Sequence, residues 1–504
     1  MTRKRSKAAL LPLLLPALLP ALLLAGCAAP EARLAVAPVD PGALGLGGGG
    51  GGAGGTIASD WWTAFDDPQL NRIMADALAH SPTLESALAR LRLAESGVAA
   101  IAASRQPQLA VNGSEMVQRL SEVYMIPPPY GGSVRAVGEL TANLGYDLDF
   151  WGRQADRVHQ ARARAGAAAL DVAAARLALA GAVAQAYVEL ARAERSIANA
   201  EAMIETRDRS IRLLQIRSDN RLDSDVDLRA AEILATEARQ TLLRARTDRE
   251  AATHALALLA GAGADYPAGI GPTHLSMDRL APPAEALPAD LLARRPDILG
   301  ARMAIEAAAA GREVARKAFY PNINLAALTG LQAMGLDKLL TGGAFTAGAG
   351  AAIHLPIFDG GQLRAGYAGA TASLDSAVAG YNEAVLTAIR EAADASTRAA
   401  ALADDLGMQR EATAGLAELR RLGEVRFDSG LGSRLDLIDA DMRLLAARQR
   451  TIDLEAGRAS ARIRLLVALG GGFETDPRGA TAEENAPEET ESARQRNSPR
   501  GNRE

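Results

Sequence analysis

The most distinctive chemistry in this sequence belongs to its single cysteine, Cys27. It follows Leu23-Leu24-Ala25-Gly26, the pattern at which bacterial lipoprotein precursors are cleaved before the sulfur takes a diacylglycerol. Basic residues precede an apolar run that three prolines interrupt, which is typical of a signal peptide and not of a spanning helix. We therefore predict a signal peptide over residues 1–26, a covalent lipid on Cys27, and no disulfide or redox chemistry. The alternative is an ordinary signal with an incidental cysteine.

No other set of side chains predicts catalysis or a bound cofactor. The histidines are widely scattered and form no His-x-x-x-His or Cys/His set, so we expect no metal site. The glycine run 47–52 lacks the preceding strand and following helix that a phosphate-binding loop needs, and it predicts a flexible tether. A net charge of −5 without a basic block argues against nucleic acid as a partner. We expect a protein that is not an enzyme. The five histidines are His80, His159, His254, His274 and His354.

The structural elements that must position the remaining candidate functional residues occur twice along the chain. The sequence around Pro107 is repeated around Pro321, an offset of 321 − 107 = 214 residues. The sequence around Arg217 is repeated around Arg426, an offset of 426 − 217 = 209 residues. A long-period repeat fixes the architecture before any motif is considered. Each half is expected to run helix, strand, loop, strand, very long helix, polar turn and helix.

Each half contains two strand candidates. Apolar and polar residues alternate in them, which is the pattern of a strand with one apolar and one polar face. The loop between the strands is rich in proline in the first half and in glycine in the second. The four predicted strands are about Pro107–Gln118, Leu140–Phe150, Ile323–Leu331 and Phe345–Ile357.

Two very long helices are predicted after the strands. No helix breaker follows Gly152 until about Asp219, which corresponds to roughly 100 Å of helix. A second long helix is predicted over about Gln362–Phe427, and partner helices should start near Asp223 and Ser433 and run back. Helices of this length indicate a coiled coil or a long bundle.

Four amphipathic strands cannot close a barrel in lipid, because a barrel needs about eight strands or more and leaves no free edge. Oligomerisation resolves this, since three chains supply twelve strands. The alternative is a soluble four-stranded sheet that caps a helical bundle. The expected lipid anchor and the alternation favour the shared barrel.

The chain resembles the outer-membrane factors, the TolC-like channels of tripartite efflux pumps, and among them the lipoprotein branch called the NodT family. The resemblance covers about Trp61–Leu469. Its most specific motifs are Tyr-Asp-Leu-Asp-Phe-Trp-Gly at Tyr146–Gly152 and Arg-Arg-Pro-Asp-Ile at Arg294–Ile298. Pro-Ile-Phe-Asp-Gly-Gly at Pro356–Gly361 also matches.

This resemblance implies a mixed α and β membrane protein that forms a homotrimer. The trimer would combine a twelve-stranded β-barrel in the bacterial outer membrane with a long α-helical coiled-coil barrel in the periplasm. Its implied partners are a periplasmic adaptor (membrane fusion) protein, an inner-membrane pump of the RND type and outer-membrane lipid. The implied function is passive conduction of small molecules from periplasm to exterior. Apart from the lipid on Cys27 no cofactor is implied.

The resemblance also assigns roles at the two polar turns, which would form the periplasmic tip. Asp436 and Asp439 match the inward acidic ring of the family's gate, and they share one helix face because they are three residues apart. The alternative is that they are simply solvated residues near a helix start. By the same resemblance Asp227 helps to hold the tip shut, with Arg434 and Arg217 as candidate partners. Leu222, Gly430 and Leu431 are candidate adaptor contacts, although the leucines could instead be helix staples.

The expected organisation has six parts. Residues 1–26 are the signal peptide, 27–60 the lipid anchor and glycine-rich tether, 61–261 the first repeat, 262–287 an equatorial linker, 288–469 the second repeat, and 470–504 a disordered tail. Two alternatives remain open for the function. One is a type I secretion duct of the same fold, and the other is a structural coiled-coil lipoprotein that forms no channel. The transported substrates cannot be read from the sequence.

Overall fold

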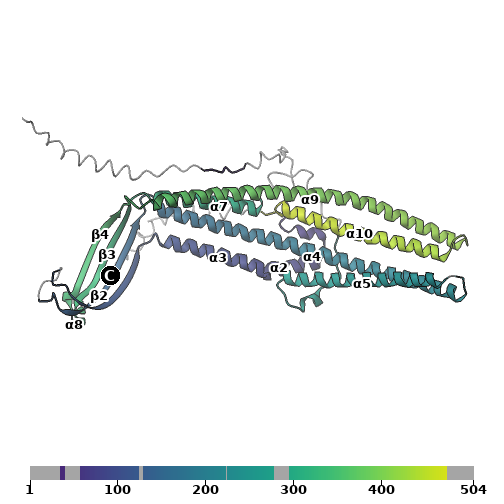
Figure 1. The fold of residues 1–504 in the computed structure, drawn as a ribbon, viewed down its shortest axis with the longest axis horizontal. Helices are drawn as coiled ribbons and strands as arrows, with labels where there is room; N and C mark the ends of the chain where they lie inside the picture. Colours follow the sequence, from purple (N-terminus) through teal and green to yellow (C-terminus); the bar gives the residue numbers. More distant parts are fainter. Residues whose placement is uncertain (1–33, 40–56, 124–128, 223, 277–293, 474–504) are drawn as a thin grey trace, which may run out of the picture.

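The protein is an elongated rod of helices with a β-sheet at one end (Figure 1). The computed structural model describes residues 34–39, 57–123, 129–222, 224–276 and 294–473. The predicted signal peptide and Cys27 therefore lie outside the described residues, as does the glycine run of the tether.

Four helices form most of the rod. The two longest, α4 (Arg153–Asp219) and α9 (Gln362–Asp428), each have 67 residues. Each is followed by a helix of 35 residues that runs back along it, α5 (Asp225–Leu259) after α4 and α10 (Arg434–Ala468) after α9. The equal lengths confirm the internal repeat and the long helices that the sequence predicts.

The four strands form one antiparallel sheet in the order β1-β2-β3-β4. The register puts the apolar positions of all four strands on one face, since Leu109 pairs with Leu144, Leu144 with Ala327, and Ala327 with Ala349. The same register puts polar residues on the other face. Among the described residues β1 and β4 have no further strand beside them and form the sheet edges. The strands are β1 (Gln108–Arg119), β2 (Val134–Leu148), β3 (Asn322–Met334) and β4 (Phe345–His354).

Three predicted strand boundaries are wrong, one of them the end of β3, which continues three residues past Leu331 to Met334. Strand β2 begins at Val134, six residues before the predicted start, because it continues to pair with β1 up to Arg119. Strand β4 ends at His354 and not at Ile357, because Pro356 has no N–H to donate to the sheet. The glycine-rich connection between β3 and β4 contains two short helices, α8 (Leu336–Leu339) and η4 (Gly342–Ala344).

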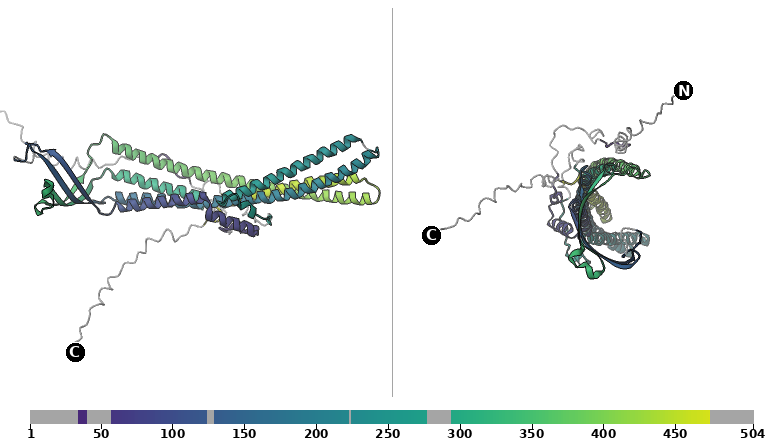
Figure 2. Two further views of the ribbon diagram at one scale, coloured as in Figure 1. Left: turned by 90° about the horizontal axis from the view of Figure 1, so that it is seen from below. Right: turned by 90° about the vertical axis from the view of Figure 1, so that its left-hand side faces the viewer.

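The helices stand side by side as a curved wall below the sheet. Near the sheet the order is α3-α4-α7-α9, with α3 spanning Pro82–Ala103 and α7 Pro296–Lys317. Further from the sheet the order is α5-α4-α10-α9. Seen along its length the protein is a C-shaped arc, with α2 (Pro68–His80) on the convex side (Figure 2). The described chain therefore forms part of a tube wall and not a closed tube.

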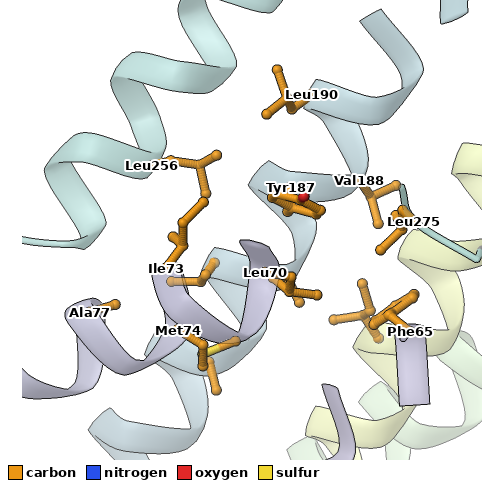
Figure 3. Close-up of a cluster of buried hydrophobic side chains, with 14 of the residues drawn as sticks. Phe65, Leu70, Ile73, Met74, Ala77, Tyr187, Val188, Leu190, Leu256 and Leu275 are labelled. Carbon is orange, nitrogen blue, oxygen red and sulfur yellow. The ribbon is translucent and has the colours of Figure 1, made fainter. Parts of the chain in front are cut away.

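The largest hydrophobic core lies at mid-length, where α2 packs on the wall. Leu70, Ile73 and Met74 of α2 are buried against Tyr187 of α4 and Leu256 of α5 (Figure 3). The short helix η2 (Trp61–Phe65) and the segment after η3 (Tyr266–Gly269) complete this layer. We call η2, α2 and residues 262–276 the belt.

The expected tether includes six described residues that are held against the wall. The backbone N–H groups of Ala35 and Val36 donate to Asp375 Oδ1 of α9 at 2.9 and 3.2 Å. The N–H of Val39 donates to Asn382 Oδ1 at 2.8 Å. Asp375 and Asn382 are seven residues apart and therefore lie on one face of α9. Within the predicted tether 27–60, residues 34–39 are therefore bound to the wall, and we call them the strap.

The predicted tail also begins too early. Gly470, Gly471 and Gly472 have positive φ values of 91°, 54° and 74° and form an ordered turn that ends α10. The N–H of Gly471 donates to the carbonyl of Leu466 at 2.9 Å. Glycine is the usual residue at such helix ends because it has no Cβ. Residues 474–504 of the expected tail lie outside the described residues.

Candidate functional site

The tip of the rod is formed by two turns with the same hydrogen-bond pattern. After α4 the N–H of Leu222 donates to Arg217 O and that of Arg221 to Ser218 O, both at 2.8 Å. After α9 the N–H of Leu431 donates to Arg426 O and that of Gly430 to Phe427 O, both at 2.9 Å. These are Schellman motifs, in which the residue after the helix cap has a left-handed backbone. The repeat therefore extends to the main chain of the tip.

Gly430 and its counterpart Arg221 occupy this left-handed position. Their φ values are 74° and 58°. Glycine adopts this conformation at no steric cost, whereas a residue with a Cβ is strained there by about 1 kcal/mol. Gly430 therefore has a structural role in the turn, in addition to the role in adaptor docking that the sequence predicts.

The leucines of the two turns point away from the chain. Leu222 is 68% exposed and Leu431 is 72% exposed. A helix staple would bury the leucine against the last turn of its own helix. The staple alternative is therefore wrong for both leucines, and they leave an apolar pair of side chains at the tip.

Asp436 and Asp439 both lie exposed on α10, but their contacts differ. Asp436 forms a capping box with Ser433, whose N–H donates to Asp436 Oδ2 at 3.0 Å while its Oγ accepts from Asp436 N at 3.1 Å. The hydrogen bond from the Ser433 backbone lowers the pKa of Asp436 below its usual value. Asp439 forms an ion pair with Arg443, one turn further along α10, at 2.8 Å.

One predicted partner of Asp227, Arg434, does not lie beside it in the described chain. Asp227 Oδ2 accepts a hydrogen bond from Ser224 Oγ at 3.0 Å, at the start of α5. Arg434 instead lies over the ring of Phe427, with 5.2 Å between its guanidinium carbon and the ring centroid. In the described chain no ion pair joins Asp227 to Arg434, because α5 and α10 lie on different sides of α4. The carbonyl of Arg217 closes the first turn.

The sequence prediction missed two arginines near Asp439. Besides Arg443, Arg207 of α4 lies near Asp439 and Glu237. Burial lowers the pKa of Arg207, and the two carboxylates act in the opposite direction. The Asp439–Arg443 spacing of four residues was a usable signal, because such pairs face each other on a helix. The contact with Arg207 joins distant parts of the sequence and left no local signal.

Within the described residues no group of histidine, cysteine, aspartate and glutamate side chains is arranged to hold a metal ion. The tip offers instead charged side chains, two tight turns and exposed apolar residues. Such a set can attract or repel solutes and can contact another protein.

Comparison with known proteins supplies the family. The sequence model described as "Outer membrane efflux protein" matches residues 73–262 and 287–471. The chain belongs to the outer membrane efflux protein family. The multidrug resistance outer membrane protein MdtP of Escherichia coli (strain K12) is 31% identical over 432 residues, which are 83% of this chain and 87% of that protein. The outer membrane protein OprJ of Pseudomonas aeruginosa is 31% identical over 427 residues, 82% of this chain and 86% of that one.

Solved structures agree with these relatives. The crystal structure of the outer membrane protein VceC from Vibrio cholerae is 33% identical and has a TM-score of 0.75, covering 83% of this chain and all of that one. The predicted family is thus confirmed. This efflux channel is a protein of the bacterial outer membrane and acts as the outer-membrane component of a tripartite efflux system. Its family consists of transport proteins and not of enzymes.

The motifs that carry the family resemblance have structural contacts in the efflux channel. Arg295, only 9% exposed, donates to the carbonyl of Ala468 at the end of α10 at 2.9 Å. It also forms ion pairs with Asp297 at 2.7 Å and with Glu391 of α9 at 3.0 Å. Trp151 donates from Nε1 to the carbonyl of Pro321 at 2.8 Å, between the sheet and the helices. The Trp151 contact connects the two repeats, whereas the Arg295 contacts join α7, α9 and α10 within the second repeat.

Proposed function

We propose that three copies of the efflux channel assemble into one tube, with a twelve-stranded barrel in the outer membrane and a helical tunnel in the periplasm. The observation that carries the proposal is that both the sheet and the helix wall have two free edges in the described chain. The sheet edges are β1 and β4, and they lie at one end of the wall. In lipid the unpaired N–H and C=O groups of β1 and β4 would be too costly to leave exposed. Strand β4 of one copy runs antiparallel to β1 of the next, so pairing these edges continues the sheet.

Apolar side chains on the edge helices support the same assembly. Ile233 and Leu243 of α5 are exposed, as are Leu419 and Leu422 of α9. These two helices are the edges of the wall in the half that lies further from the sheet. A neighbouring copy would bury these side chains, which accounts for leucines that otherwise face water.

The apolar face of the sheet would contact lipid. Its side chains Leu109, Val111 and Ile353 are about two thirds exposed or more, at 70, 68 and 71%. Helix α4 also contains a stretch that is apolar and long enough to cross a membrane. However, α4 packs against four other long helices, and its 67 residues would extend far beyond a bilayer. The sheet is therefore the better candidate for the spanning part.

We further propose that Cys27 carries the lipid anchor. The leader sequence and the uniqueness of this cysteine support it. Mass spectrometry of the mature N-terminal peptide should find a diacylglycerol thioether on Cys27, and Cys27→Ser should abolish it. An unmodified cysteine in the mature protein, or a leader cleaved elsewhere, would reject the proposal.

The tip would form the gate and the docking site. In a trimer Asp436 and Asp439 would stand in rings near the narrow end of the tunnel. The exposed Leu222 and Leu431 would contact the periplasmic adaptor, which joins the channel to an inner-membrane pump of the RND type. The pump would supply energy and select small-molecule substrates, and the channel would conduct them passively.

Conductance tests the channel directly. Purified trimer in a planar bilayer should show discrete conductance steps, and these should grow when Asp436 and Asp439 are changed to alanine. Glu418→Gln is a matched control, because this exposed carboxylate pairs with Arg421 within one turn of α9. Absence of conductance in all variants would reject the channel in favour of a structural lipoprotein.

Adaptor capture tests the docking site. Leu222→Asp and Leu431→Asp should each weaken capture of the adaptor encoded with the pump, whereas Leu340→Asp at the opposite end of the rod should not. Equal capture by all three variants would contradict docking at the turns. Capture of a type I secretion adaptor in preference to an efflux adaptor would identify the protein as a secretion duct.

A further inference from the structure

One face of α10 carries a regular stripe of exposed positions. Beginning at the tip they recur at alternating intervals of three and four residues, which is the spacing of a single face in a coiled coil. The buried residues between them pack toward α4 and α9, so the stripe occupies the surface between those two contacts. The stripe consists of Asp436, Asp439, Arg443, Ala446, Arg450 and Asp453.

Contacts of α4 identify which side of the wall this stripe faces. Glu194 accepts from the N–H of Thr273 at 2.9 Å and from its hydroxyl at 2.8 Å, so it lies on the side of the belt. Arg192 is two residues away and points to the opposite side of α4, since two residues turn a helix by about 200°. It reaches Asp453 of the stripe at 3.7 Å. The stripe is therefore on the side away from the belt.

The belt lies on the convex surface of the wall, where α2 is seen in Figure 2. The stripe must then line the concave surface. In the proposed trimer the concave surfaces of the three copies enclose the bore, so the stripe would line it.

The charges along the stripe change sign. Asp436 and Asp439 come first, and Arg443 follows Asp439 by one turn, about 6 Å along the helix. Arg450 follows after about 10 Å more. Asp439 and Arg443 are in contact at 2.8 Å, and Arg207 of α4 adds a further positive charge beside Asp439. The acidic residues nearest the tip are thus balanced by basic residues just above them.

We propose that Arg443 and Arg450 form basic rings on the wall of the bore, and that Arg443 keeps the constriction from selecting strongly for cations. This inference rests on the proposed trimeric channel. Rings of aspartate alone would attract cations and repel anions. With a basic ring one turn away, anionic and zwitterionic solutes meet a favourable charge at the same level as cations do. The solutes admitted would therefore include anionic and zwitterionic molecules.

Ion selectivity of the full, lipidated trimer tests the assignment. The reversal potential across a planar bilayer in a KCl gradient gives the ratio of potassium to chloride permeability. Arg443→Gln should raise this ratio roughly threefold at low salt, and less at high salt where charges are screened. Arg443→Lys keeps the charge and should behave like the parent. Arg448→Gln removes an exposed arginine from another face of α10 and should leave the ratio unchanged.

A double variant separates charge from structure. Asp439→Asn alone should lower the ratio, and Asp439→Asn combined with Arg443→Gln should return it near the parent value. A merely structural ion pair predicts no such compensation. An unchanged ratio in a conducting Arg443→Gln trimer would overturn the inference, as would an equal shift in Arg448→Gln. Loss of conductance in every protein tested, the parent included, would instead overturn the proposed channel on which the inference rests.

Discussion

Replacement of Tyr187 by phenylalanine should loosen the belt while leaving the helix wall folded. The Tyr187 side chain is fully buried, and its hydroxyl donates to Asp67 Oδ2 at 2.7 Å. Asp67 is only 1% exposed and also accepts from the N–H groups of Gln69 and His274, both at 2.9 Å. This carboxylate therefore joins the start of α2, the wall helix α4 and the far end of the belt.

The magnitude follows from what phenylalanine removes. The ring still fills the same space, so the loss is one hydrogen bond to a buried carboxylate. Such charge-assisted bonds contribute about 1.5–3 kcal/mol. A loss of about 2 kcal/mol from the free energy of opening the belt corresponds to a roughly 30-fold larger open population. The Gln69 side chain loses the Tyr187 hydroxyl as an acceptor but still donates to the carbonyl of Gly271. This second loss therefore adds little to the expected change in free energy.

Hydrogen exchange measured by mass spectrometry is the suitable assay, because it reports local opening peptide by peptide. Peptides over residues 65–80 and 266–276 should exchange about 30-fold faster in Tyr187→Phe, and peptides from α9 should not change. Tyr130→Phe, at an exposed tyrosine near the sheet, is the control. Belt exchange within twofold of the parent would refute the reasoning, as would an equal acceleration along α9.

Three other variants test separate parts of the structure. Gly330→Ala should prevent trimer assembly, because a Cβ there would overlap the backbone of β2, while Gly350→Ala has open space and should assemble normally, as gel filtration would report. Burial and a hydrogen bond to a carboxylate of α2 raise the pKa of Tyr266 to about 12, so its stabilisation of the belt should persist below pH 10 and be lost between about pH 10 and 12. This loss of belt stability can be measured by hydrogen exchange of the belt, and it should be smaller in Tyr266→Phe. Equal dependence of belt exchange on pH in Tyr266→Phe and the parent would contradict the prediction. Arg295→Met should lower the free energy of unfolding by about 2–4 kcal/mol. The loss should be nearer about 2 than about 4 kcal/mol, because Asp297 and Glu391 are partly exposed. An unchanged midpoint of unfolding in guanidinium chloride would contradict a stabilising role for Arg295.

The sequence predicts the long elements well because their signals are local and repeated. Between Arg153 and Asp219 no proline occurs and glycine is rare, so nothing interrupts the helix. Alternation identifies the strands because one face must be apolar over their whole length. The end of β4 was missed because one proline, Pro356, outweighs two apolar residues that continue the pattern.

The contacts at the tip could not be predicted in the same way. Whether Arg434 meets a carboxylate or the ring of Phe427 depends on the order of helices around α4, which no local pattern records. The strap was missed for the same reason, since Ala35 and Asp375 are 340 residues apart. Composition alone describes a glycine-rich region as a tether, but it cannot detect side chains on a distant helix that bind its backbone.

The contacts of the second turn also limit how the proposed acidic gate would widen. Asp436 is held to Ser433 by two hydrogen bonds, and the turn before it is fixed by Gly430 in a conformation that suits glycine. In the proposed trimer, rotating the Asp436 side chain away from the bore would break this capping box, at a cost of about 1 kcal/mol in each copy. Tilting α9 and α10 together would break none of these bonds, because turn, cap and carboxylate would move as one body. Widening by displacement of the helix pair is therefore easier than widening by side-chain rotation. The first turn differs in both respects. Arg221 holds the left-handed position that Gly430 occupies in the second turn, and Ser224 forms no capping box at the start of α5.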